Sequence, residues 1–145
     1  MVKPMRIFGT CLILSLLACG RENEEEFSFD NRGSLCVRAT ANGALVVRAI
    51  APTCLSSSCS RVKQATCTVE YDGTQVIVQS TLRVMETSGV CTDDCGALTA
   101  ECNLSTLSAG EYSIRYGDSV GTLQVPTTRT VLFDTGFGSS FCQDF

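Results

Sequence analysis

The residues of this chain with the most chemical potential are its ten cysteines. Cys54 and Cys59 are separated by four residues, whereas thioredoxin-like redox sites have a gap of two. Cys91 and Cys95 are separated by three residues, and together with Cys102 they could be drawn as a zinc site. These cysteines lack the spacing of a zinc ribbon, so the pattern favours structural disulfides over redox or zinc chemistry.

Two adjacent carboxylates, Asp93 and Asp94, raise a calcium hypothesis. An EF-type loop needs oxygen ligands at several spaced positions and an acidic twelfth residue, and this segment lacks that pattern. Two neighbouring aspartates are more often simply solvated on a loop. The sequence therefore favours solvated side chains here and leaves calcium as the minor alternative.

The chain contains no histidine and no tryptophan. The missing histidine removes Ser-His-Asp and Cys-His catalysis, His-ligated zinc and the usual acid-base residue near neutral pH. No nucleophile motif compensates for this absence. We therefore expect a protein that is not an enzyme and that carries no cofactor.

The first 18 residues have the layout of a secretory signal peptide, with Lys3 and Arg6 followed by an apolar run over residues 7–17. As a helix, that run of about 11 residues would span roughly 16 Å, about half of the hydrocarbon thickness of a membrane. It is too short for a permanent membrane anchor. The sequence therefore predicts that residues 1–18 are cleaved.

The junction Leu16-Leu17-Ala18-Cys19 resembles the lipobox of bacterial lipoproteins. The resemblance implies that the Cys19 sulfur receives a diacylglyceryl group and that Cys19 becomes the acylated N-terminus. Two or three acyl chains hold a protein on a membrane essentially permanently. Gly20 lacks the acidic side chain that commonly retains lipoproteins at the inner membrane, which favours the outer membrane. An ordinary cleaved signal is the nearest alternative.

The resemblance implies that Cys11 leaves with the signal peptide and that Cys19 carries lipid, so we expect eight further cysteines in the mature chain. An even number of cysteines in an exported chain indicates disulfides, here four. Sequence alone leaves their pairing open. The eight predicted disulfide cysteines are Cys36, Cys54, Cys59, Cys67, Cys91, Cys95, Cys102 and Cys142.

The mature chain is acidic, with nine lysines and arginines against fifteen aspartates and glutamates, a formal charge of −6. Because it has no basic run, we expect no nucleic-acid partner. Residues 19–32 are charged and have no apolar periodicity, which is typical of a tether that follows the lipidated cysteine. Residues 33–145 are then one domain.

Two β-hairpins are predicted in that domain. Residues 34–40 and 44–50 are β-prone and flank Asn42-Gly43, a dipeptide that suits a type I′ turn. Residues 65–71 and 76–84 alternate apolar and polar side chains around a second turn at Asp72-Gly73, the strongest strand signal in the chain. Further strands are expected over residues 120–125, before Pro126, and over residues 130–133.

Two loops are the candidate recognition segments, residues 51–60 and residues 87–97. The first contains Pro52, four serines and two cysteines. A short helical or strand turn is expected over residues 97–102. The Gly-rich C-terminal segment has no regular pattern, and we expect Cys142 to hold it against the domain.

Residues 107–117 resemble the tyrosine corner of immunoglobulin-like sandwiches. The resemblance implies that the Tyr112 hydroxyl bonds to upstream backbone, with Ile114 and Tyr116 also facing the core. Ser113 and Arg115 would face outward. Together, the strand pattern and this resemblance predict an all-β fold, a disulfide-stapled antiparallel β-sandwich of immunoglobulin-like architecture.

We therefore expect a cell-envelope lipoprotein, bound to a membrane through lipid at Cys19, that acts as a non-catalytic binding, adhesion or structural module. Its loops would meet an envelope protein or a glycan. A small envelope inhibitor or assembly factor is the alternative. In general plan only, the chain also resembles the contact-stimulated lipoproteins of gliding bacteria.

Overall fold

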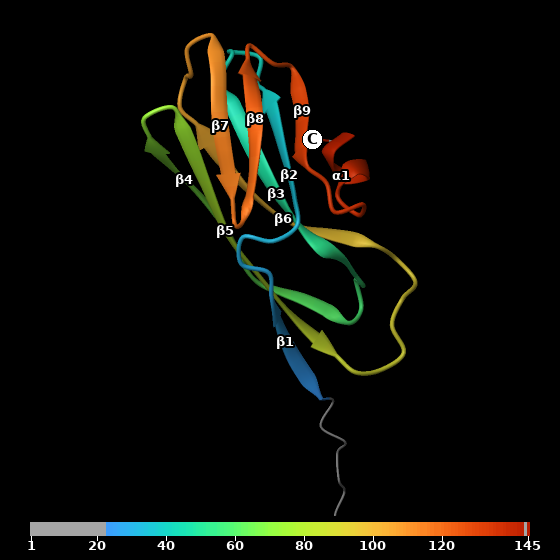
Figure 1. Cartoon of the computed structure of the whole chain (residues 1–145). Helices are drawn as coiled ribbons and strands as arrows, with labels where there is room; N and C mark the ends of the chain where they lie inside the picture. The colour runs from blue at the N-terminus through green and yellow to red at the C-terminus, as the bar shows by residue number, and fades with distance from the viewer. Residues whose placement is uncertain (1–22, 144) are drawn as a thin grey trace, which may run out of the picture.

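A computed structural model describes residues 23–143 and 145, which form two packed β-sheets and one short helix (Figure 1). One sheet contains β1 (Glu24–Ser28), β4 (Ser60–Asp72), β5 (Gln75–Thr87), β7 (Gly110–Tyr116) and β8 (Ser119–Val125). The other contains β2 (Ser34–Ala39), β3 (Leu45–Leu55), β6 (Gly96–Leu104) and β9 (Arg129–Phe133), and α1 (Ser139–Gln143) lies beside it. The predicted all-β sandwich is confirmed.

The core lies between the sheets and is built by period-two alternation. On β5 the side chains of Val76, Val78, Leu82 and Val84 are all buried, while Arg83 between the last two is exposed. Successive side chains of a strand point to opposite faces, so this pattern sets one face against the second sheet. The alternation predicted for this segment is confirmed.

The first hairpin forms as predicted, with β2 antiparallel to β3 from Ala39↔Leu45 onward. Its turn differs from the predicted type I′ turn, which needs positive φ at both central residues. Only Gly43 has a positive φ, +80°, and its N–H donates to the Thr40 carbonyl at 2.9 Å. Gly43 alone supplies the left-handed conformation, because the loop is longer than two residues.

The second hairpin joins β4 to β5 through Gly73, whose φ is +61°. Both strands are longer than the alternation suggested, and their register shifts between Val62 and Gln64, which makes Lys63 a bulge residue. Apart from the pair β5 and β7, which run parallel, all paired strands of the described chain are antiparallel.

Two loop predictions are corrected by the pairing of β3 with β6. Residues 51–60 are not one loop, because β3 continues to Leu55 and β4 begins at Ser60. Residues 97–102 belong to a regular strand, since β6 pairs with β3 through to Leu55↔Gly96. The β3–β6 register shifts between Ile50 and Cys54, so Pro52 sits where the ladder is interrupted.

The tether prediction is wrong for residues 24–28, which form β1. This strand pairs antiparallel with the end of β5, from Glu24↔Thr87 to Ser28↔Arg83. The same side of β5 pairs with β7 only at residues 75–78, which leaves the end of that edge open for β1. The signal peptide, the lipobox and Cys19 lie outside the described residues.

Tyr112 and Tyr116 hold β7 in place through their hydroxyls. The Tyr112 hydroxyl donates to the Ser108 carbonyl at 3.0 Å, as the tyrosine-corner resemblance implied. Tyr112 is half-buried, whereas Tyr116 is only 3 % exposed. The upstream hydrogen bond is thus confirmed, and the closer likeness to immunoglobulin domains stays a prediction.

The C-terminal segment contains α1, which the sequence pattern did not predict. The Cys36–Cys142 disulfide ties this helix to β2, as expected for Cys142. Phe145 lies under two guanidinium groups, with its ring centroid 4.7 Å from Arg38 Cζ and 4.1 Å from Arg48 Cζ. The segment therefore covers the outer face of the second sheet.

Candidate functional site

Two disulfides join the β3–β4 connection to the β5–β6 loop. Cys54 is bonded to Cys95, and Cys59 is bonded to Cys91. Cys54 and Cys59 are thus two separate anchors and not one staple. We call residues 54–60 and 87–95, which these two bonds hold together, the stapled tip.

The remaining predicted cysteines are paired away from the tip. Cys67 bonds to Cys102 across the two sheets. All eight predicted cysteines are therefore in disulfides. The zinc alternative is wrong, because Cys91, Cys95 and Cys102 are each bonded to a different partner and none has a free thiolate.

A network of hydrogen bonds adds to the two disulfides. The Ser57 N–H donates to both carboxylate oxygens of Asp94, at 3.1 and 3.2 Å. The Thr92 N–H donates to Ser58 Oγ at 2.9 Å, and Ser56 Oγ lies 2.9 Å from Thr92 Oγ1. These bonds connect the two loops at several points, so the tip is held as one unit.

Asp94 is a structural carboxylate of this network. Hydrogen bonds from the Thr92 hydroxyl and from the Ser57 side chain and backbone lower its pKa from 3.8 to about 2. The carboxylate oxygens are thus engaged with hydrogen-bond donors of the tip itself. In the part of the chain that the structure describes, no group of three or more His, Cys, Asp or Glu side chains is placed to hold a metal ion.

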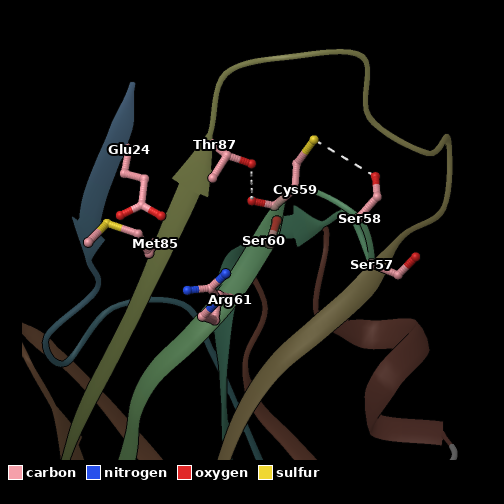
Figure 2. Close-up of a pocket in the computed structure, with 8 residues that line it drawn as sticks. All are labelled: Glu24, Ser57, Ser58, Cys59, Ser60, Arg61, Met85 and Thr87. Atoms are coloured by element: carbon pink, nitrogen blue, oxygen red, sulfur yellow. Dashed lines mark hydrogen bonds between the residues drawn. The ribbon is translucent and has the colours of Figure 1, made fainter. Parts of the chain in front are cut away.

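A small cavity of about 190 Å³ lies between the tip and the N-terminal strand. Figure 2 shows Glu24 on β1 and Arg61 on β4 on either side of Met85. The Thr87 hydroxyl donates to the Cys59 carbonyl at 3.2 Å and closes one end. Pockets for drug-sized ligands start at about 300 Å³, so this one is too small for such a ligand.

One apolar side chain projects from the tip. Val90 is fully exposed, and it lies in the β5–β6 loop next to Cys91. Exposed single hydrophobic residues are common on protein surfaces. Val90 differs in its position, because the Cys59–Cys91 bond fixes the backbone that presents it.

The tip lies at the end of the domain where the described chain begins. Glu24 pairs with Thr87, and the Ser88 N–H donates to the Asn23 carbonyl at 3.0 Å. Figure 1 shows β1 at the lower end of the molecule, where the loops between β3 and β4 and between β5 and β6 also lie. The first described residues, Asn23 and Glu24, therefore lie beside the tip.

Of the two recognition loops predicted from sequence, the structure keeps residues 56–59 and residues 88–95 as loops and brings them together. Sequence reasoning missed Glu24, Arg61 and Met85 as neighbours of the tip. Only the pairing of β1 and β4 with β5 places them there, and no local signal marks it.

The fold and the tip define a class of protein: a disulfide-rich domain of two packed β-sheets, stapled in four places. Four disulfides are typical of proteins that fold outside the cytoplasm. No family model matches the chain, and neither a curated protein nor a solved structure is significantly similar to it. Within residues 23–143 and 145, no helix is both long and apolar enough to cross a membrane.

Proposed function

We propose that this protein is a lipid-anchored lipoprotein of the bacterial cell envelope whose stapled tip binds another envelope protein close to the membrane surface. The observation that carries the proposal is the cross-linking of two exposed loops by two disulfides at the end where the chain enters the domain. Binding loops that are already ordered lose less conformational entropy on association.

The anchor follows from the lipobox resemblance at Cys19. Five residue steps separate Cys19 from Glu24, and an extended chain of that length reaches at most about 18 Å. Lipid at Cys19 therefore keeps the tip within reach of the membrane surface. A partner of the tip is accordingly a membrane-proximal component.

The charge around the tip favours a protein partner with a basic surface. Glu24, Glu25 and Glu26 form most of β1, and Asp93 and Asp94 lie in the β5–β6 loop. Anionic headgroups would be repelled by these carboxylates, so the tip is unsuited to insertion into an anionic lipid surface. Electrostatic complementarity would instead raise the association rate with a basic protein surface.

The test of the anchor uses the full chain expressed in a bacterial envelope. Wild type should incorporate labelled fatty acid and fractionate with membranes, and Cys19→Ala should do neither. A Cys19→Ala protein that keeps labelled fatty acid and floats with membranes would contradict the lipid anchor.

The test of the tip compares two exposed valines. Val90→Asp should abolish crosslinking of the anchored protein to its envelope partner, because a charge replaces the apolar contact. Val120→Asp, on β8, is the matched control, since Val120 is 62 % exposed and lies outside the tip. Equal crosslinking of the two variants would contradict the proposal that the tip binds the partner. It would not contradict the proposed lipid anchor.

A further inference from the structure

The strand β4 has an open edge of unusual length. It contains 13 residues, and among the described residues it pairs only with β5. In Figure 1 it is the outermost strand of its sheet. Most of its side chains are exposed on both faces. The unpaired N–H and C=O groups of such an edge are a template for another strand.

The charges of β4 are complementary to those of a second, antiparallel β4. When the strand is laid against a reversed copy of itself about Cys67, and Lys63 is skipped as in the β4–β5 register, the cation at one end, Arg61, meets the anion at the other end, Asp72. Gln64 meets Glu70 in the same register. All four of these side chains are exposed and lie on the outer face of the strand. Oppositely charged residues that face each other across two strands stabilise the pair.

The exposed apolar residues of β4 match in that register as well. Val62 is 52 % exposed and Tyr71 is 44 % exposed, and both point to the inner face of the strand, opposite Val84 and Val76 of β5. The bulge at Lys63 is what makes them meet. If the dimer skips Lys63 as the β4–β5 register does, Val62 falls opposite Tyr71 of the other copy and not one residue away.

We propose that a second copy of this chain docks on this edge, with the two β4 strands antiparallel and their two-fold axis at Cys67. An axis perpendicular to the sheet relates the two copies, so the contact is isologous and closes as a dimer. The five-stranded sheets of the two copies, one from each, then form one continuous sheet through the β4–β4 contact.

The same charges that permit self-pairing reject other strands. Charged side chains and bulges on an edge strand normally protect it against unspecific pairing. A strand without an anion opposite Arg61, or without a cation opposite Asp72, leaves those charges unpaired in the contact. The edge is therefore selective for its own sequence. Opposite charges attract a second β4, and unpaired charges disfavour other strands, and specificity generally uses both effects.

The dimer is compatible with a lipid anchor at Cys19. Its orientation on the membrane rests on the proposed function. The antiparallel contact puts the two β1 strands at opposite ends of the pair. When the two-fold axis lies along the membrane normal, both Cys19 residues are at the same height above the membrane. Both tips then stay at the membrane surface.

The experiment measures self-association of the purified full-length protein in detergent by sedimentation velocity over a range of protein concentrations. Arg61→Asp and Asp72→Arg should each raise the dimer dissociation constant by about tenfold or more, because each places like charges opposite each other at two symmetric positions. The combined variant R61D/D72R restores opposite charges and should bring the constant back to about that of wild type. Arg115→Asp, at an exposed position of β7, is the control and should change nothing.

Hydrogen exchange supplies the second measurement. Amides of β4 that do not bond to β5 should become protected as the protein concentration rises, and amides of the edge strands β6 and β9 should not. A protein that is monomeric at all concentrations overturns the proposal. So does a dimer that ignores the charge exchange, or protection of the β4 edge only when a different protein is added.

Discussion

The hydroxyl of Tyr116 lies 2.8 Å from Ser80 Oγ, inside the core between the two sheets. The same hydroxyl donates to the Arg32 carbonyl at 3.1 Å. Ser80 is only 4 % exposed, so these three groups satisfy one another in a place that water scarcely reaches. The cluster fastens β5, β7 and the segment that leads into β2 at one point.

Tyr116→Phe should destabilise the domain by about 1–3 kcal/mol, because it leaves the buried Ser80 hydroxyl without its partner. The double variant with Ser80→Ala should be less destabilised than the sum of the two single variants, since both polar groups are then gone. Urea melts of the four proteins measure this. Strict additivity would contradict the coupling of Tyr116 to Ser80.

Tyr112→Phe should cost less, about 0.5 kcal/mol, because the bond to the Ser108 carbonyl is exposed to solvent. Tyr112→Ala should cost more than that, but less than the about 3–5 kcal/mol of a fully buried aromatic side chain, since Tyr112 is half-buried. The same urea melts apply. Loss of partner binding by Tyr112→Phe at unchanged stability would instead place Tyr112 in a binding site.

Stability should fall at alkaline pH through Tyr116. Burial raises the pKa of the Tyr116 phenol above its usual value of 10, and the Ser80 hydrogen bond only partly opposes this. The unfolded state therefore releases this proton first as the pH rises, so the contribution of the neutral phenol is complete below pH 10 and is lost as the pH rises toward the folded pKa. Urea melts between pH 8 and pH 11 should show a weaker decline for Tyr116→Phe than for wild type.

Asp94 should titrate in an NMR pH titration with a pKa of about 2, lowered from 3.8 by the hydrogen bonds from Thr92 and Ser57. Because the pKa of Asp94 is lower in the folded state, the stabilisation of the tip by its carboxylate is fully present above pH 3.8. This stabilisation is lost as the pH falls toward 2. Asp94→Asn should speed exchange of the Ser57 amide, and Asp93→Asn is the matched control. Equal exchange in both variants would show that Asp94 does not hold the tip.

The tip disulfide should matter more for binding than for stability. By loop-closure entropy, replacing Cys59 and Cys91 together by serine should cost about 4 kcal/mol, and replacing Cys36 and Cys142 together should cost about 5 kcal/mol, because the second bond closes a longer loop. Partner crosslinking should nevertheless fall only in the first variant, which removes the bond next to Val90 and leaves Cys54–Cys95 as the one disulfide between the two loops. Thermal melts and crosslinking of both variants test the separation.

Much of the fold was predictable because it depends on residues close together in the chain. The alternation of Val76, Val78, Leu82 and Val84 defines one buried face of a strand whatever its partners are. The glycines Gly43 and Gly73 mark two hairpins, since their positive φ angles suit few other residues. The even number of cysteines after residue 19 predicted four disulfides, and the structure contains four.

The pairings depended on contacts between distant segments. Residues 24–28 have a polar, acidic sequence, and they form a strand only because the end of the β5 edge is open to them. Cys54 meets Cys95, and Cys59 meets Cys91, only because β3 pairs with β6 and β4 pairs with β5. The sequence by itself therefore determined that the chain forms strands, turns and disulfides, whose signals are local. The tertiary structure alone decided that two separate loops become one rigid tip, because loop closure over more than 30 residues is set by the packing of the sheets and not by any local pattern.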